Sequence, residues 1–352
     1  MEMNEVIIIG RINKGKQPIG GETGKNQVLI QGLAPYCKVY GLDFYRNKQR
    51  PWIFLQTLWT LLVHHKATLI LSSTASNVYP LMRLHKLFNS KRNVIHWCIG
   101  GKFADYVSDG KYSVPVLNSL DANIVESDAM RQSLVKSGVN NSIHLPNFKT
   151  IPYKPSLDKR LNILSKSGRI RFVYLSRVMK VKGADLILQA VEYINNKYGS
   201  ESLEVDFYGL IEEGYDKEFL AEVKKLPNVQ YKGMLNLKCS EGYDTLSTYH
   251  AMLFPTYHSS EGFAGVFIDS FIAGLPVITT NWHVNPEIVD DGINGVLIQP
   301  ENIDALISAM TDVIEGNIDI DTMSKNAQSY AEKYNVKNVI TSNLLKQLKI
   351  IK

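Results

Sequence analysis

The sequence predicts an α/β protein made of two doubly wound, Rossmann-like domains, each built on a parallel sheet. Short apolar runs that read as buried strands alternate with segments of helical periodicity along both halves of the chain. A second series of this kind begins at residues 170–175 (IRFVYL), after a stretch of weak periodicity that is rich in Lys, Pro and Ser. With 352 residues, 45% of them hydrophobic, the chain is long enough to fill two cores.

These observations predict the domain boundaries. Residues 1–150 form the first domain, residues 151–168 a linker and residues 169–335 the second domain. The first domain is expected to hold strands and helices in alternation, with Ser127 as the N-cap of its last helix. The predicted strands cover residues 6–10, 38–42, 68–71, 94–98, 122–126 and 143–146, and the predicted helices cover 23–34, 51–65, 79–88 and 128–137.

The segment after the first strand has the spacing of a phosphate-binding loop. Residues 10–16 match GxxxxGK, but Gln17 stands where that loop needs Ser or Thr, and Pro18 follows where its helix must continue. The GxGxxG pattern of dinucleotide sites is also absent from this segment. We therefore interpret it as a loop that leads to Gly20 and Gly21, which are either backbone contacts for a ligand or a plain glycine turn.

The helix predicted over residues 51–65 is unusually apolar and contains Trp52 and Trp59. Basic residues precede it at 46, 48 and 50, so this helix could touch a membrane interface. The alternative, which we favour, is that it covers the sheet. The longest apolar stretch, residues 52–63, is too short to span a bilayer.

The second domain contains a strand, a basic loop and a helix in its first forty residues. The loop carries Arg177 and Lys182, and it leads into a helix predicted over residues 184–198. An arginine can bind two phosphate oxygens and a lysine adds a point charge, so this loop predicts an anion site at a helix N-terminus. Further strands are predicted over 203–208, 229–232, 251–254, 275–279 and 295–298, and helices over 241–250, 263–273 and 303–314.

A second candidate site lies in residues 261–280 (EGFAGVFIDSFIAGLPVITT), which read as loop, helix and strand. Gly262 and Gly265 let the backbone approach a ligand, and the first N–H groups of the helix can hold an anion. Glu261 and Asp269 frame this site, and carboxylates accept hydrogen bonds from sugar hydroxyls. The alternative is an ordinary βαβ unit with an acidic residue at each end of its helix.

The spacing Glu261-x₇-Asp269 resembles the Glu-x₇-Glu signature of the family 4 retaining glycosyltransferases, which have the GT-B fold. The pair Arg177 and Lys182-Gly183 resembles the pyrophosphate-binding pair of the same family. The resemblance implies a nucleotide-diphosphate sugar as donor, with a UDP-sugar expected, held in a cleft between the domains. It also implies transfer with retention, without metal or cofactor, to a glycan or a lipid-linked glycan, in bacterial capsule or lipopolysaccharide assembly.

The same resemblance assigns roles to individual residues. Glu261 would hold donor-sugar hydroxyls, Asp269 the ribose, and Arg177 and Lys182 the pyrophosphate. His96 would lie near the donor sugar, although a lone His at a strand end is as often a core residue. The remaining candidates are expected to contact the donor through the backbone or around the base: Gly20, Gly21, Gly209, Met234, Gly262, Phe263, Ala264 and Gly265. The final stretch, residues 336–352, is expected to pack back on the first domain.

Charge is unevenly distributed along the chain. Residues 1–150 hold 18 Lys and Arg against 9 Asp and Glu, whereas the rest holds 21 against 25. A basic first half fits an anionic membrane surface or a lipid-linked pyrophosphate acceptor, unless the charge is only a solvated face. No nucleic-acid-binding motif is found, so we expect no nucleic-acid partner.

Cysteine and histidine usage narrows the remaining possibilities. Three widely spaced Cys fit a reducing cytoplasm, with the protein expected there or peripherally on the inner face of the cell membrane. The eight His show no metal-ligand spacing. Asp319 and Asp321 spell DxD but lack the strand context of a metal site, so a helix N-terminal pair is expected instead.

Two rival functions stay open. One is a nucleotide-sugar epimerase of the same fold, which needs further acids that we cannot place. The other is a non-catalytic subunit that binds a sugar nucleotide, a reading that Asp269 in place of Glu keeps open. Donor binding without turnover on any acceptor would favour the second.

Overall fold

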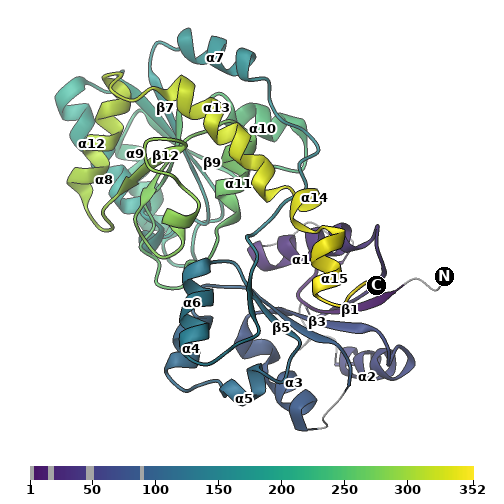
Figure 1. Cartoon of the computed structure of the whole chain (residues 1–352). Coiled ribbons are helices and arrows are strands. Elements are labelled where there is room, and N and C mark those ends of the chain that lie inside the picture. The colour runs from purple at the N-terminus through teal and green to yellow at the C-terminus, as the bar shows by residue number, and fades with distance from the viewer. Residues whose placement is uncertain (1–3, 15–19, 45–50, 88–90) are drawn as a thin grey trace. The chain divides into compact units, whose positions relative to one another are not determined.

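The computed structural model describes residues 4–14, 20–44, 51–87 and 91–352, and the chain divides into two compact units (Figure 1). The first unit comprises Met1–Thr150, Gly262–Ala264 and Lys333–Lys352, and the second comprises Ile151–Glu261 and Gly265–Glu332. The segment expected to be a linker, residues 151–168, counts with the second unit and contains helix α7 (Leu157–Ser165).

The first unit is built on a six-stranded sheet of order β2-β1-β3-β4-β5-β6, in which every pairing is parallel. Strands β1, β3 and β4 are buried along nearly their whole length, because helices cover both faces of the sheet. The strands are β1 (Glu5–Gly10), β2 (Lys38–Asp43), β3 (Thr68–Ser73), β4 (Val94–Cys98), β5 (Ala122–Val125) and β6 (Ser142–His144).

Two separate apolar clusters define the two faces of this sheet. One cluster joins α2 (Ile53–Val63), α3 (Ala75–Leu87), α4 (Phe103–Ser108), α5 (Val114–Leu117) and α6 (Asp128–Lys136). The other joins α1 (Gly21–Leu33) with the chain's last helices, α14 (Val336–Val339) and α15 (Ser342–Gln347). The final stretch thus completes the core of the first unit.

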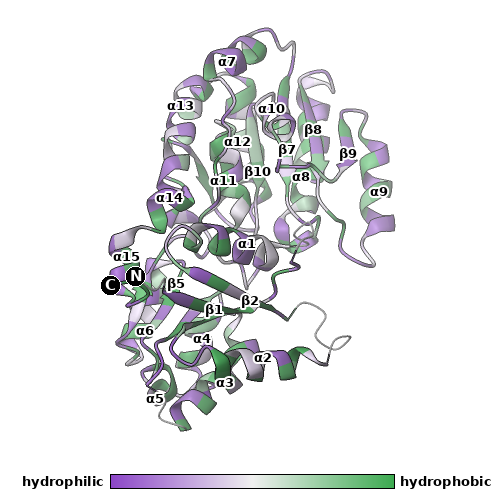
Figure 2. Cartoon of the chain, turned by 90° about the vertical axis from the view of Figure 1, so that its right-hand side faces the viewer, coloured by the Kyte–Doolittle hydropathy of each residue, from purple (hydrophilic) through white to green (hydrophobic). Residues whose placement is uncertain are grey.

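The second unit has the same design, with a parallel sheet of order β12-β11-β10-β7-β8-β9. Green, hydrophobic residues are visible along this sheet in Figure 2, and its strands β10 and β11 are buried along their whole length, as expected for strands covered on both faces. The strands are β7 (Ile170–Leu175), β8 (Leu203–Tyr208), β9 (Val229–Gly233), β10 (Ala251–Phe254), β11 (Val277–Thr280) and β12 (Gly295–Ile298).

The helices of the second unit also divide into two groups (Figure 1). One group packs around α8 (Ala184–Tyr198) and includes α9 (Asp216–Lys225) and α12 (Ile303–Ile314). The other packs around α11 (Gly265–Ile272) and includes α10 (Ser240–Leu246) and α13 (Ile320–Tyr330).

Helix α7 is fixed to the second unit by a buried arginine. The Arg160 guanidinium donates to the carbonyl oxygens of Ser247 and Tyr249 at 2.7 and 2.6 Å, and to the hydroxyl of Ser324. Burial lowers the pKa of Arg160 to about 9. This anchor was not predicted from the sequence, because its acceptors are mostly backbone carbonyls.

Several predicted bounds differ from the observed ones. Helix α1 begins at Gly21 rather than residue 23, and α3 begins at Ala75, four residues before its predicted start. Helix α11 begins at Gly265, not at residue 263, so Asp269 lies little more than one turn into it rather than two. Helices α4, α5, α7 and α9 were not predicted; α4 and α5 are too short for helical periodicity to show.

Candidate functional site

The loop after β7 is held in one conformation by two glycines. Gly183 has φ of +85°, and a Cβ there would lie 2.5 Å from the carbonyl oxygen of Pro255. Gly209, which follows β8, has φ of +140°, and a Cβ there would lie 1.7 Å from the carbonyl oxygen of Ser176. Neither position accepts a side chain, because both the backbone angle and the space are unsuitable. The basic loop is therefore packed tightly against both neighbouring strand ends.

Lys182 and Glu261 meet at this edge, from loops that follow the adjacent strands β7 and β10. The Lys182 ammonium lies 3.2 Å from Glu261 Oε2 and 3.4 Å from the hydroxyl oxygen of Ser176. Glu261 is only 8% exposed, and its Oε2 also accepts a hydrogen bond from the Thr256 hydroxyl at 3.1 Å. The two sequence motifs, 79 residues apart, thus form one polar site.

Arg177 lies on the same loop with a different environment. Its side chain is exposed, and it forms no ion pair with any of the residues that the structure describes. Its backbone is fixed, because its carbonyl oxygen accepts a hydrogen bond from the Tyr174 hydroxyl at 2.6 Å. Lys180, by contrast, forms an ion pair with Glu218 at 2.5 Å. Arg177 is therefore a guanidinium on a rigid loop that is open to an incoming anion.

The strand order places the other candidates along the same edge. Glu261 follows β10, Arg177 and Lys182 follow β7, Gly209 follows β8 and Met234 follows β9, and these four strands are neighbours in that order. Met234 is 66% exposed, and Gly209 donates its N–H to the carbonyl oxygen of Gly233 at 2.8 Å. An extended ligand along this edge would meet carboxylate, cations and an apolar end in turn.

Asp269 is buried within the second unit. It is 3% exposed, and its Oδ1 accepts a hydrogen bond from the Tyr243 hydroxyl at 3.0 Å. Burial is the main cause that raises the pKa of Tyr243, with the Asp269 charge adding to it. Sequence reasoning missed Tyr243, as it did Thr256 and Ser176, because single hydroxyl residues outside a motif give no signal.

Gly262, Phe263 and Ala264 count with the first unit, whereas Glu261 and Gly265 count with the second. Within the first unit, the carbonyl oxygen of Phe263 accepts a hydrogen bond from the Asn147 side chain at 2.9 Å. Phe263 also packs edge-on against Tyr334, with ring centroids 5.1 Å apart. The assignment of these three residues to donor binding stays a prediction.

His96 lies in the interior of the first unit. Its ring is fully buried on β4 and packs edge-on against Phe103 at 4.9 Å between centroids. Neither ring nitrogen has a hydrogen-bond partner among the described residues, and burial lowers the pKa of His96 to about 4. The ring is thus enclosed and neutral at pH 7, and the site role of His96 stays a prediction.

Gly20 and Gly21 lie at the start of α1. Gly20 is its N-cap with extended backbone, and a Cβ at either glycine would meet nothing within 4 Å. Local geometry therefore does not require glycine here, and the predicted ligand contact remains a prediction. Most of the phosphate-loop-like segment before them, residues 15–19, lies outside the described residues.

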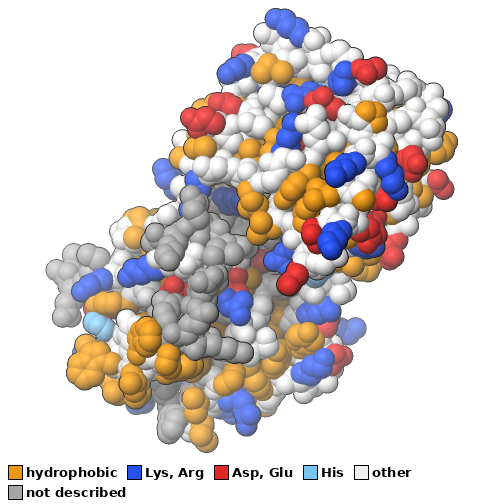
Figure 3. Space-filling model, turned by 180° about the vertical axis from the view of Figure 1, so that it is seen from behind, with side chains coloured by type: hydrophobic (Ala, Val, Ile, Leu, Met, Phe, Trp, Pro, Cys, Tyr) orange, Lys and Arg blue, Asp and Glu red, His pale blue; other side chains and the backbone are white. Residues whose placement is uncertain are grey.

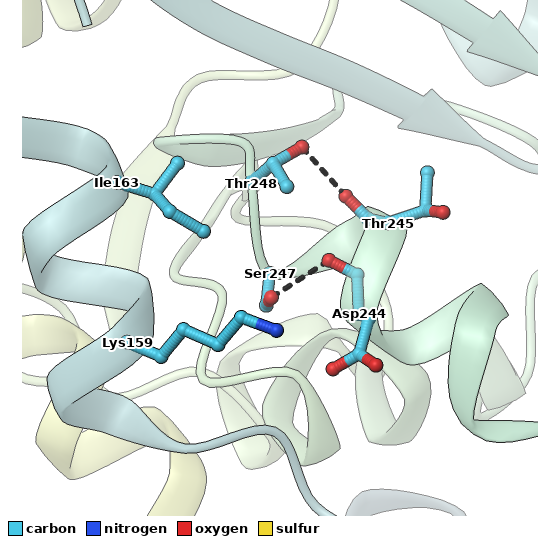
Figure 4. Close-up of a pocket in the computed structure, with 6 residues that line it drawn as sticks. All are labelled: Lys159, Ile163, Asp244, Thr245, Ser247 and Thr248. Atoms are coloured by element: carbon cyan, nitrogen blue, oxygen red, sulfur yellow. Dashed lines mark hydrogen bonds between the residues drawn. The ribbon is translucent and has the colours of Figure 1, made fainter. Parts of the chain in front are cut away.

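A shallow hollow lies elsewhere in the second unit, between α7 and α10 (Figure 4). It is lined by Lys159, Ile163, Asp244, Thr245, Ser247 and Thr248. Two of its hydroxyls are already bonded locally, from Ser247 to the Asp244 carbonyl at 2.7 Å and from Thr248 to the Thr245 carbonyl at 2.8 Å. None of the predicted site residues lines it.

Within the described ranges, no group of three or more His, Cys, Asp or Glu side chains is arranged to hold a metal ion. Asp319 instead caps α13, where its carboxylate accepts from the Thr322 N–H at 2.9 Å. The same ranges contain no helix that is both long and apolar enough to cross a bilayer.

Comparisons with known proteins point to one family. Residues 158–331 match the family "Glycosyl transferases group 1". A 2-deoxystreptamine N-acetyl-D-glucosaminyltransferase of Niallia circulans is 26% identical over 186 residues, which cover 52% of this chain and 44% of that protein. The matched stretch thus spans less than half of that relative's length.

Solved structures extend the likeness to both units. The structure of Anabaena HepE in complex with UDP and glucose matches 99% of this chain and 100% of its own, with a TM-score of 0.70 and 17% identity. The lipopolysaccharide outer core galactosyltransferase WaaB matches 98% and 99%, with a TM-score of 0.68 and 14% identity. Residues 158–331 are therefore similar to the group 1 glycosyl transferases, within a chain that has the two-sheet GT-B fold.

Proposed function

We propose that this protein transfers a sugar from a nucleotide-diphosphate sugar to an acceptor hydroxyl. The observation that carries the proposal is the cluster of Arg177, Lys182 and Glu261 on two adjacent strand ends of the second unit. Two cations suit a pyrophosphate, and a buried carboxylate suits the hydroxyls of a sugar.

The chemistry assigned to the cluster is stabilisation of the leaving group. As the glycosidic bond breaks, negative charge develops on the β-phosphate, and Arg177 and Lys182 would neutralise it. Glu261 accepts a hydrogen bond from the Thr256 hydroxyl. It would hold the donor sugar by accepting further hydrogen bonds from the hydroxyl groups of that sugar. Since the Lys182 ammonium is already held beside Glu261 and Ser176, little reorganisation of this cation accompanies the reaction.

The finer features of the proposal rest on the family resemblance. They are retention at the anomeric carbon, no requirement for metal or cofactor, UDP as the nucleotide and a glycan or lipid-linked glycan as acceptor. UDP and glucose are present in the Anabaena HepE structure, and WaaB acts in the lipopolysaccharide outer core. We also infer a cytoplasmic enzyme of polysaccharide assembly that works at an anionic membrane surface.

The experiment is a thermal-shift screen of UDP, GDP, ADP and their sugars in buffer with a chelator. At one hundred times Kd a ligand stabilises the native state by about 2.7 kcal/mol, which raises Tm by a few degrees. We expect a shift with UDP that Arg177→Ala removes. Lys180→Ala is the matched control, because Lys180 is a cation on the same loop that is paired with Glu218.

Turnover separates transfer from the two rivals. Release of UDP that depends on an added acceptor supports the transferase. Conversion of the donor sugar without an acceptor would identify an epimerase, and binding with no turnover on any acceptor would identify a non-catalytic subunit.

A further inference from the structure

Helix α2 presents an apolar face to the outside of the first unit. Trp52, just before the helix, is 59% exposed. Figure 3 shows a cluster of hydrophobic side chains on this part of the unit. The α2 apolar face consists of six helix residues, each exposed by 50–72%: Phe54, Leu55, Leu58, Trp59, Leu62 and Val63.

The helix itself is firmly attached to the unit. Ile53 and Thr57 are buried beneath it, and Leu61 packs on the core of the sheet. The Arg92 guanidinium donates to the carbonyl oxygens of Leu61 and His64 at 2.7 and 3.0 Å, which caps the end of the helix. The apolar face therefore belongs to an ordered helix, and a contiguous exposed apolar patch on an ordered surface marks an interaction site.

The chain segment that includes this face carries basic residues and no acidic ones. Between Asp43 and Asp105 there are nine Lys and Arg residues and no Asp or Glu. Lys66, Arg83 and Lys86 are exposed, and they form no ion pair within the described part of the chain. Helices α2 and α3 pack on the same side of the sheet, through the same apolar cluster. Positive charge and apolar surface therefore occur together on one side of the first unit.

We propose that the α2 apolar face inserts in the plane of a lipid bilayer whose headgroups are anionic. Trp59 and Trp52 suit the boundary between headgroups and acyl chains, where an amphipathic ring is most stable. The leucines between them would enter the acyl region, and Lys66, Arg83 and Lys86 would attract the headgroup phosphates. The helix covers the sheet as expected, through Ile53, Thr57 and Leu61, and the proposal assigns its exposed residues a second role.

A second copy of the chain fits this face less well. A two-fold dimer brings the same patch of both copies together. Apart from Glu5, which pairs with His64 at the end of α2, the charges named around this face are positive, so the two copies would repel each other around the apolar contact. An anionic bilayer satisfies the apolar residues and the charges at the same time.

The test is sedimentation of the full chain with vesicles, without donor or acceptor. We expect binding to vesicles of equal parts phosphatidylcholine and phosphatidylglycerol, weakened by high salt, and at least about tenfold weaker binding to phosphatidylcholine alone. Leu55→Gln/Leu58→Gln/Trp59→Gln should lose binding to both vesicles. Lys66→Gln/Arg83→Gln/Lys86→Gln should lose mainly the preference for phosphatidylglycerol.

The matched control is Tyr193→Gln/Leu220→Gln/Ile293→Gln, which removes exposed apolar side chains from the second unit and should bind like the wild type. Unchanged Tm confirms that each variant folds. Equal vesicle binding by the wild type and the α2 variant would overturn the proposal. So would a wild-type dimer that the α2 variant dissociates, without vesicle binding by either protein.

Because the readout is binding alone, failure of this proposal is distinguishable from failure of the proposed transferase activity.

Discussion

The loops that follow β1 and β7, the first strand of each unit along the chain, differ in the charge that they leave for a ligand. In the first unit, the N–H groups of Ile12 and Lys14 donate to the two carboxylate oxygens of Asp43, at 2.9 and 3.2 Å. In the second unit, the loop directs Lys182 toward Glu261 and leaves Arg177 exposed. The β1 loop thus binds a carboxylate of its own chain, whereas the β7 loop keeps a cation for an external anion.

This difference shows why the spacing of glycines and lysine in a loop does not by itself identify a phosphate site. Residues 10–16 have the spacing of a phosphate-binding loop, but the carboxylate that ends β2 already accepts from two of the backbone donors. A phosphate there would face the charge of Asp43. The β7 loop has no such spacing, yet its Arg177 guanidinium is exposed and forms no ion pair with the described residues, so it remains available to a ligand.

The largest expected effect is the loss of kcat when a cation or the carboxylate of the candidate site in the second unit is replaced. Lys182→Met should lower kcat by about 10²–10³, as does loss of one group that stabilises transition-state charge. Glu261→Gln should lower kcat by about 10², because the donor sugar would be held less well in position. Steady-state kinetics with the donor found in the screen will measure this. Wild-type kcat in Lys182→Met would remove the β7 loop from the mechanism.

The second effect compares the buried histidines of the two units. His96 in the first unit and His250 in the second both have a pKa lowered to about 4 by burial, against 6.5 for a free imidazole. Because the unfolded chain takes up the proton first, each should remove stability as pH falls from 6.5 to 4, on the order of 3 kcal/mol at the lower limit.

Urea denaturation of His96→Leu and His250→Asn at pH 7 and pH 4.5 measures these contributions. Each variant should lose less stability than the wild type between the two pH values. His250 accepts a hydrogen bond from the Arg171 N–H at 2.9 Å, so His250→Asn should also cost stability at pH 7. Identical pH dependence in wild type and variants would rule out both histidines as its source.

The third effect concerns Asp43, the carboxylate that the β1 loop binds. Asp43→Ala should destabilise the first unit by about 1–3 kcal/mol, because two backbone N–H groups lose their acceptor. The Kd of the Asp43→Ala variant for UDP, measured by titration calorimetry, should equal that of the wild type. A large loss of UDP affinity would place the nucleotide at the β1 loop and reverse the comparison.

The smallest effect concerns Tyr243. Tyr243→Phe removes the donor to Asp269 and should cost about 1 kcal/mol in unfolding free energy, seen as a lower midpoint in urea. Gly265→Ala is not a suitable control, since it alters the start of α11. Tyr231→Phe is suitable, because its hydroxyl also donates one bond, to the Gly209 carbonyl at 2.9 Å. A Tyr243→Phe midpoint equal to that of the wild type would show that this bond contributes nothing.

The sequence predicted the two α/β halves because β1, β7 and β10 are short apolar runs with helical periodicity after them. Through the family resemblance it also assigned Lys182 and Glu261 to one donor site, although it did not predict that β7 and β10 are neighbouring strands. It could not show that Asp43 fills the β1 loop or that Tyr243 reaches Asp269, because both contacts depend on tertiary packing. The exposure of the α2 apolar face could not be predicted for the same reason. An apolar helix has the same sequence pattern whether its apolar side chains are buried or exposed.

The most direct measurement is a crystal structure of the protein with UDP. The account predicts density for the pyrophosphate at the β7 loop, with its oxygens within hydrogen-bond distance of the Arg177 guanidinium and the Lys182 ammonium. Pyrophosphate density at the loop after β1, beside Asp43, would contradict it.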